Sequence, residues 1–295
     1  MREIENLSSV IYAGQYEDEK TPSVLTIEDG VEEIAENAFR GFSSLKKVIF
    51  PPSLRRISAA AFADCTNLSE ISIPFGVREI ADEAFSGCAS LLGVRLPDSV
   101  TYIGEGCFQG CASLSSLKLS ESLRSIGAGA FSFCFNLHSV VIPDSCECVE
   151  FNAFCGCFSL ESVRLSSNMQ ILEESLFEGC RSLSAVDLPA GLLRIGRRAF
   201  RGCASLVSLI LPVSLYEIGL DAFAECSALR RLAIPKGVYE MEDGEVFGGC
   251  DSLREISFGG DAEGWERLFG GRALTVQTSC GEVITPKIYF LDAKK

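Results

Sequence analysis

A phenylalanine recurs every 23 residues through most of this 295-residue chain, and this spacing limits the folds that the chain can adopt. The nine copies at this interval are Phe39, Phe62, Phe85, Phe108, Phe131, Phe154, Phe177, Phe200 and Phe223, and a tenth, Phe247, follows after 24 residues. A period between about 20 and 50 residues indicates a solenoid or another repeat array. Because each repeat of such an array contacts only its neighbours, we expect one elongated domain rather than two globular ones.

The pattern inside each repeat predicts one strand per turn of the solenoid. In the repeat that begins at Val77, Ile80 follows three residues later, which is typical of a short extended segment. An Ala-Phe step comes next and suits one or two helical turns. Val94 and Leu96 then alternate with the polar Arg95, and this period of two indicates a half-buried strand. A proline usually follows, where no ladder hydrogen bond is needed.

The remainder of each turn is too short for a long helix, which excludes tetratricopeptide and ankyrin arrays with their mainly helical units of about 33–34 residues. The sequence therefore predicts an α/β repeat solenoid with leucine-rich-repeat geometry: a right-handed superhelix with a concave parallel β-sheet and little helix. The pattern LPDSVTYIGEGCFQGCASLSSLKLS resembles the BspA-like leucine-rich repeats, and the resemblance extends over roughly residues 24–260. The tail FGGDAEGWERLFGGRALTVQTSCGEVI resembles the closing segment of that family, with Trp265 in a turn and a hairpin-like pair around residues 279–281.

We expect three parts along the chain: an N-terminal cap or arm at residues 1–23, a solenoid of about ten units at 24–260, and a C-terminal cap at 261–295. The family resemblance implies a non-catalytic binding module, often displayed on bacterial or protist surfaces, where it adheres to host proteins or other cells. No signal peptide is visible after Met1. The expected location is therefore the cell surface or the medium, by resemblance, or the cytoplasm as the alternative.

The charge of the chain excludes several kinds of partner. The formal net charge is −14, whereas nucleic-acid binders need a basic face for phosphate contacts. The same acidity disfavours docking on anionic lipid. The longest apolar run, residues 206–215, contains Pro212 and is too short to span a bilayer. We expect a protein or peptide partner, no nucleic acid, no membrane insertion and a monomeric chain.

Nine of the fourteen cysteines lie three residues after the repeat phenylalanine: Cys65, Cys88, Cys111, Cys134, Cys157, Cys180, Cys203, Cys226 and Cys250. The first repeat has Phe42 there, so this position is an apolar slot, and we expect reduced thiols stacked in the core. Cys146, Cys148, Cys155 and Cys157 are the one metal-like group of the sequence. A metal site and a local disulfide stay open there, but we favour ordinary core and surface thiols, and we expect no metal and no cofactor.

The sequence holds little that could carry catalysis. The single histidine, His138, lies at a strand-edge position that varies freely among the repeats. One histidine makes a His-dependent triad or a two-His metal site improbable. No nucleotide-binding loop or zinc-protease motif is present. The sequence therefore predicts a protein that is not an enzyme, with no catalytic residues.

The central exposed position of each strand is the strongest functional signal. Because successive repeats stack, these residues should form one row, and its members are Ile49, Ser72, Arg95, Lys118, Val141, Arg164, Asp187, Ile210, Ala233 and Ser257. We expect the ligand site in its central part: Arg95, Lys118, Val141, Arg164, Asp187 and Ile210. Basic and apolar groups together suit an acidic protein or peptide, such as a host or cell-surface protein, or an anionic glycan. The alternative is that a solenoid tolerates almost any residue on this face.

Overall fold

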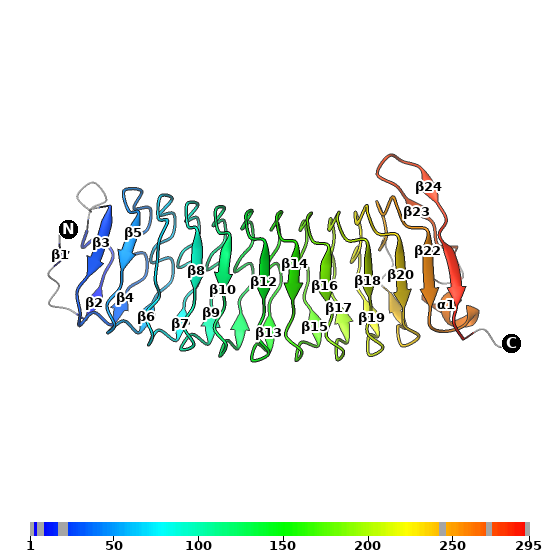
Figure 1. Cartoon of the computed structure of the whole chain (residues 1–295), viewed down its shortest axis with the longest axis horizontal. Helices are drawn as coiled ribbons and strands as arrows, with labels where there is room; N and C mark the ends of the chain where they lie inside the picture. The colour runs from blue at the N-terminus through cyan, green and yellow to red at the C-terminus, as the bar shows by residue number, and fades with distance from the viewer. Residues whose placement is uncertain (1–2, 5–8, 17–22, 242–245, 270–272, 293–295) are drawn as a thin grey trace.

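Successive repeats form the stacked turns of one long solenoid with the two chain ends at opposite tips (Figure 1). The structure is a computed structural model, and it describes residues 3–4, 9–16, 23–241, 246–269 and 273–292. Each 23-residue turn has three sides: a strand, a second and shorter strand, and a segment of hydrogen-bonded turns that carries the repeat phenylalanine. This architecture confirms the predicted solenoid with parallel sheets and little helix.

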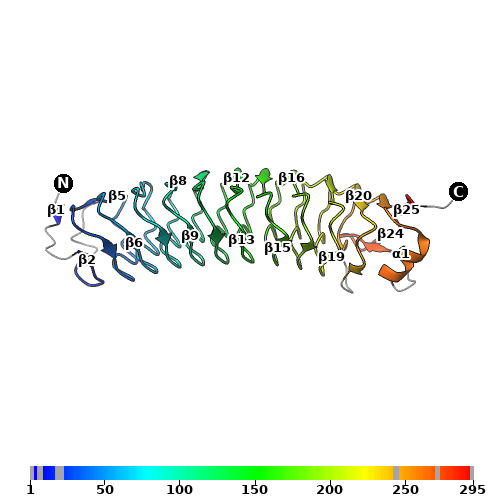
Figure 2. The ribbon, with the colours of Figure 1, turned by 90° about the horizontal axis from the view of Figure 1, so that it is seen from below.

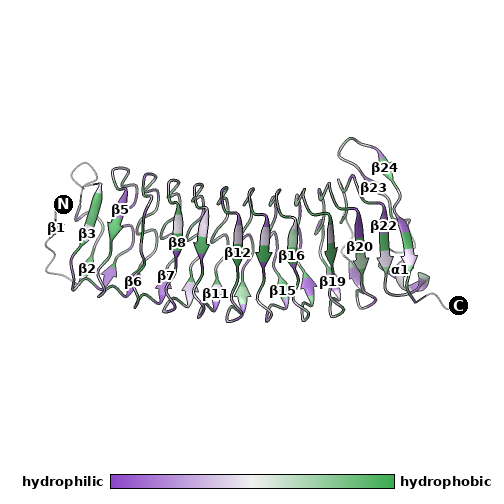
Figure 3. Cartoon of the chain, in the orientation of Figure 1, coloured by the Kyte–Doolittle hydropathy of each residue, from purple (hydrophilic) through white to green (hydrophobic). Residues whose placement is uncertain are grey.

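The first side of the solenoid carries the strands that the alternating pattern predicts, together with one further strand at each end of the chain. They are β1 (Glu3–Ile4), β3 (Val24–Ile27), β5 (Lys47–Ile49), β8 (Gly93–Arg95), β10 (Ser116–Lys118), β12 (Ser139–Val141), β14 (Ser162–Arg164), β16 (Ala185–Asp187), β18 (Ser208–Ile210), β20 (Arg231–Ile234), β22 (Glu255–Phe258) and β25 (Lys287–Phe290). Neighbouring strands pair in parallel, as Val140 with Val163 does. Figure 3 shows that hydrophobic and hydrophilic residues both occur along these strands.

A second parallel ladder of two-residue strands follows the proline turn of each repeat. Its strands are β2 (Val10–Ile11), β4 (Glu33–Ile34), β6 (Arg56–Ile57), β7 (Glu79–Ile80), β9 (Tyr102–Ile103), β11 (Ser125–Ile126), β13 (Cys148–Val149), β15 (Ile171–Leu172), β17 (Arg194–Ile195), β19 (Glu217–Ile218) and β21 (Glu240–Met241). The buried member of each strand except β21 is the isoleucine, or its equivalent, that follows the proline turn, and Met241 in β21 is half-buried. The short extended segment is therefore a second sheet.

The third side is a ladder of turns and not the helical segment that we expected at the Ala-Phe step. In the repeat of Phe131, Gly129 and Phe133 both have left-handed backbones, with φ of 60° and 59°. Their N–H groups, and that of Phe131, donate to carbonyls of the next repeat at 2.7–2.9 Å. A helix needs consecutive right-handed residues. The alternation of left- and right-handed residues therefore replaces helical hydrogen bonds with bonds between repeats.

The core of the solenoid is a stack of phenylalanine rings flanked by ladders of leucine, isoleucine and valine. Consecutive repeat rings lie nearly parallel with centroids 5.1–6.0 Å apart, from Phe39 to Phe247. The ring of Tyr16 extends the stack at the N-terminal end. These spacings are close to the ~4.8 Å between neighbouring strands. The rod is nearly straight in both views, and the sheet that we expected on a concave face lies along a nearly flat one (Figures 1 and 2).

The N-terminal segment continues the repeat, whereas the C-terminal end departs from it. The segment that we expected as a cap or arm contributes β1 to the first ladder and β2 to the second, while residues 1–2, 5–8 and 17–22 lie outside the described residues. At the C-terminal end, α1 (Ala262–Leu268) buries Trp265, and β25 pairs with β22. The antiparallel pair β23 (Val276–Gln277) and β24 (Val283–Ile284) confirms the expected hairpin around residues 279–281.

Candidate functional site

The six residues of the predicted ligand site lie in one row on the first side of the solenoid. We call this row, formed by Arg95, Lys118, Val141, Arg164, Asp187 and Ile210, the strand-face stripe. Lys118 pairs with Arg95 in the β8–β10 register, and Arg164 lies between Val141 and Asp187 in the β12–β14–β16 sheet. All six side chains are exposed. The sequence therefore located a continuous surface row, formed from residues 23 positions apart.

The positive charges of the strand-face stripe differ in how far they are neutralised. Arg164 donates from Nη2 to Oδ2 of Asp144 at 3.1 Å. The backbone N–H of Ser167, its hydroxyl and then Arg164 lower the pKa of Asp144, so this carboxylate stays charged. Within the described part of the chain, neither Arg95 nor Lys118 has an acidic partner at ion-pair distance. These two adjacent cations are the part of the stripe that is free to bind an anionic group.

The stripe also offers apolar surface. Val141 is 54% exposed and Ile210 is 85% exposed, which is high for aliphatic side chains in a strand. Towards the N-terminus, the repeat after β5 forms only an isolated bridge at Glu70 instead of a strand. A hollow of about 360 Å³ lies there, between Ile49, Ile71 and Ser72. The row therefore combines cations, apolar side chains and a shallow depression, which suits a macromolecular partner better than a small molecule.

The four cysteines of the metal-like group do not converge. Cys148 is exposed on the second sheet, Cys155 is half-buried on the turn side, and Cys157 is buried in the core. The thiol of Cys146 donates to the carbonyl of Cys148 at 3.3 Å. In the ranges that the structure describes, no three His, Cys, Asp or Glu side chains lie where they could bind one metal ion. All four thiols are free in this structure.

The slot thiols have a structural partner. In all nine slots the thiol donates to the carbonyl of the repeat phenylalanine of the preceding turn, at Sγ–O distances of 3.0–3.3 Å. The same carbonyl also accepts the N–H three residues later in its own turn, as Phe131 does from Cys134. Cysteine therefore fills an apolar volume and gives a buried carbonyl a second donor, which valine or alanine could not. This arrangement confirms the expected reduced core thiols.

We expect a thiol reagent to discriminate sharply among the fourteen cysteines of the native protein. At pH 8, Ellman's reagent should modify the exposed Cys148 and Cys280 quickly and Cys155 slowly, because burial raises the pKa of Cys155 to about 11. The eleven buried thiols should react only after denaturation. A C148S variant should lose one fast equivalent. Fast reaction of four or more thiols in the folded protein would contradict the buried slots.

His138 lies at an exposed position just before β12. Its backbone carbonyl accepts the N–H of Glu161 at 2.8 Å as part of the repeat ladder. Among the described residues, no helix combines the length and the apolar character that crossing a bilayer requires.

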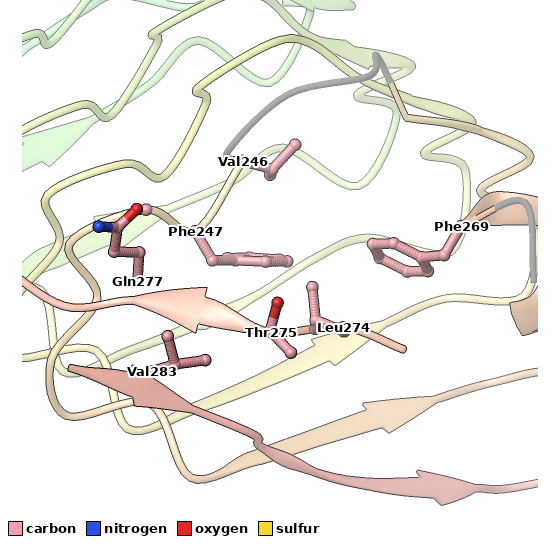
Figure 4. Close-up of a pocket in the computed structure, with 8 residues that line it drawn as sticks. Val246, Phe247, Phe269, Leu274, Thr275, Gln277 and Val283 are labelled. Atoms are coloured by element: carbon pink, nitrogen blue, oxygen red, sulfur yellow. The ribbon is translucent and has the colours of Figure 1, made fainter. Parts of the chain in front are cut away.

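A cavity of about 250 Å³ lies between the last repeat and the C-terminal hairpin (Figure 4). Phe247, the last ring of the stack, lines it on one side, and Phe269, Leu274 and Val283 line it from the cap. The cavity lies where the next phenylalanine of the stack would stand. Because most of the residues that line it belong to the cap, we assign it to the imperfect closure of the core.

Sequence reasoning missed a group of exposed aromatic side chains on the turn side. Phe133, Phe135, Phe151 and Phe158, which we call the turn-side aromatic cluster, are each 37–50% exposed. A signal for it exists in the aligned repeats: the residue two after the repeat phenylalanine is glycine in seven of ten repeats and Phe133 in only one. Four exposed phenylalanines within two repeats become visible only when equivalent positions are compared around the whole solenoid.

Comparison with known proteins agrees with this geometry. The sequence profile of the BspA type leucine-rich repeat region matches residues 32–159 and 148–267. No curated protein matches the chain. Among solved structures, a leucine-rich repeat protein from Bacteroides ovatus is 23% identical, with 95% of this chain and 87% of that one covered and a TM-score of 0.54.

Two further structures are similar over most of this chain. The pneumococcal vaccine antigen PcpA is 22% identical, with coverage of 88% and 68% and a TM-score of 0.51. A leucine-rich cell surface protein from Faecalibacterium prausnitzii is 27% identical, with coverage of 83% and 81% and a TM-score of 0.46.

Proposed function

Because this chain belongs to the family of proteins with BspA-type leucine-rich repeats, we propose that it is a non-catalytic protein-binding module that uses the strand-face stripe. The observation that carries the proposal is the pair of adjacent, unneutralised cations Arg95 and Lys118 beside the exposed Val141. In a chain with a net charge of −14, such a patch is a place where an acidic partner can approach without repulsion. The row is long enough for an extended partner because it crosses several repeats.

The chemistry of the stripe favours an acidic protein or peptide, or an anionic glycan. Lysine and arginine bind carboxylate or sulfate groups through charge-assisted hydrogen bonds. Exposed Val141 and Ile210 add apolar contacts that a polypeptide partner would use and a glycan would not. The setting that we propose is adhesion at a cell surface, as the family resemblance implies.

An intracellular protein-interaction scaffold is the alternative setting. Two of the fourteen cysteines, Cys148 and Cys280, are exposed and free. Exposed free thiols persist in a reducing compartment and are oxidised or paired outside it. The binding surface would be the same in both settings, so the experiment below tests the module and the partner identifies the setting.

The test is capture of partners by immobilised protein from extracts of host cells and of the source cells, with heparin and an acidic peptide as defined probes. We expect R95E/K118E to lose the captured partner, because both reversals place carboxylates where the anionic group would bind. The matched control is R78E/R197E, which makes the same change of charge at two exposed arginines away from the stripe. Equal capture by the wild type and both variants would exclude the stripe as the binding site.

A further inference from the structure

The turn-side aromatic cluster forms a second, ordered surface on the opposite part of the repeat. The rings of Phe135 and Phe158 stack with centroids 4.9 Å apart and an interplanar angle of 16°. The Cζ atom of Arg181 lies 4.7 Å from the centroid of Phe158, and the ring of Phe133 meets Phe135 edge-on at 6.3 Å. The rings are therefore held in place by one another although each is more than a third exposed. Contiguous exposed aromatic side chains of this kind are typical of interaction surfaces.

Phe133 occupies a backbone position that disfavours it. Its φ is 59°, in the left-handed region that seven of the ten repeats fill with glycine. A bulky residue there is rare and costs stability. Its ring lies over Gly156, where a Cβ atom would come within 2.6 Å of Cδ1. The core does not use this ring, so packing gives no reason for its presence on the surface.

A hollow of about 220 Å³ opens beside Phe133 and Phe151. Gly106, Ala128 and Gly129 line the hollow. Other repeats have larger side chains at these positions; for example, Glu83 and Asn152 are the equivalents of Gly106 and Gly129 in the same row. The backbone of this row has the same left-handed conformation in every repeat from Asn37 to Asp221. The hollow is therefore made by missing side chains rather than by a change of the backbone.

The wall opposite the aromatic rings is acidic. Glu83 and Glu105 line the hollow together with Gln109. Neither carboxylate has a cationic partner among the described residues. The nearby Tyr102 also lies in a negative field, because burial and then several carboxylates, Asp82 first, raise the pKa of its hydroxyl. No lysine or arginine of the described chain lines the hollow to balance the negative charge of these carboxylates.

A buried hydroxyl without a partner also faces this hollow. Ser132 lines it, is only 2% exposed, and its Oγ has no hydrogen-bond partner in the structure. A Cβ atom added at Gly129 would point at this oxygen, at 3.4 Å. Leaving a buried hydroxyl unsatisfied is costly, so a donor from outside the chain would stabilise the site.

We propose that this hollow binds an arginine or lysine side chain of a partner peptide, with an adjacent apolar residue of that peptide packed on Phe135 and Phe158. The rings of Phe133 and Phe151, which line the hollow, contact the cation and its aliphatic stem. Glu83 and Glu105 accept its N–H groups in charge-assisted hydrogen bonds, and Ser132 accepts one more. The site lies away from the strand-face stripe, so this proposal is independent of the function proposed for that row.

The test is calorimetric titration of the whole chain, at low salt, with the acetylated peptide Gly-Leu-Arg-Leu-Gly amide and with its citrulline analogue, which has the same shape but no charge. We expect the arginine peptide to bind and the citrulline peptide to bind roughly tenfold or more weakly. G129N should weaken the arginine peptide by a similar factor because it fills the hollow. Asparagine is compatible with this backbone, since Asn37 and Asn152 have φ of 56° and 58° at equivalent positions.

Two further variants separate binding from folding. F133G restores the glycine of the other repeats, so it should weaken the peptide without lowering the melting temperature. F75A removes another exposed phenylalanine, outside the cluster, and should leave binding unchanged. Absence of binding by the wild type, equal affinity for the two peptides, or undiminished binding by G129N would overturn the proposal. Binding to phosphatidylcholine vesicles that F133G abolishes, without preference for the arginine peptide, would assign the cluster to lipid and overturn it as well.

Discussion

Replacing Phe131 by alanine should lower the free energy of unfolding by about 3–5 kcal/mol, the usual cost of truncating a fully buried phenylalanine. Its side chain is 0% exposed, and its ring lies between those of Phe108 and Phe154 with centroids 5.4 Å away on both sides. The substitution therefore removes two stacking contacts and leaves a cavity in the middle of a continuous core. Urea unfolding followed by circular dichroism measures the loss.

The chain provides a control for this substitution only two residues away. Phe133 is 43% exposed and has a strained backbone, so F133G should change stability little. Because each repeat contacts only its neighbours, hydrogen exchange in F131A should become faster in the two adjacent repeats and hardly change at the ends of the rod. A loss below about 1 kcal/mol, or an equal loss in F133G, would mean that the repeat phenylalanine does not form the core.

The parts of the fold that could be predicted are those that repeat in register. Because equivalent residues such as Val94 and Leu117 lie side by side in the structure, their spacing in the sequence is directly a position in space. The positions of the strands, of the slot cysteines and of the residues in the strand-face stripe all follow from the 23-residue period. The third side could not be derived so simply, because the left-handed residues there include Asn37, Ala60 and Arg198 as well as glycine.

The electrostatics of the candidate site were also beyond the sequence pattern. Arg164 pairs with Asp144, which lies 20 residues earlier in the turn that follows the neighbouring strand. The contact therefore joins two neighbouring repeats at positions that are not equivalent. The exposed aromatic side chains follow the period only in part: Phe135 and Phe158 are equivalent residues of neighbouring repeats, whereas Phe133 meets Phe135 across unequal positions. The period therefore predicts which residues form a row. It does not predict which side chains of different rows contact one another, because that depends on the conformation of each side chain.

Raising the pH above about 8.5 should destabilise this protein steeply, because its folded state holds many thiols in the protonated form. Burial raises the pKa of ten core thiols: Cys88, Cys107, Cys111, Cys134, Cys146, Cys157, Cys180, Cys203, Cys226 and Cys250. In the unfolded chain a thiol has a pKa of about 8.5. In the fold the pKa of Cys157 rises to about 12.

The sign follows from the proton balance. Below about pH 8.5 the thiols are protonated in both states, so their contribution to stability is fully present. Above it, unfolding releases a proton from each thiol, and stability falls until the pH reaches the folded values. The slope approaches about 1.4 kcal/mol per pH unit for each thiol that becomes exposed. Even for local unfolding of three repeats, each with one slot thiol, the free energy of unfolding would fall by roughly 4 kcal/mol per pH unit.

Thermal unfolding from pH 7.5 to 10, under reducing and oxygen-free conditions, measures this slope, and the triple variant C134A/C157A/C180A is its control. The substitutions remove three sulfhydryl donors and therefore lower stability at every pH, but that loss is constant and does not affect the slope. Lysine and tyrosine titrate alike in the variant and in the wild type, so the difference between their slopes belongs to the thiols. We expect the slope for global unfolding to be smaller in the variant by roughly 4 kcal/mol per pH unit, which is the share of three thiols. An unchanged slope would mean that these thiols titrate alike in the folded and unfolded chain, and the slots would then not be the dry, hydrogen-bonded positions that the structure places between the phenylalanine rings.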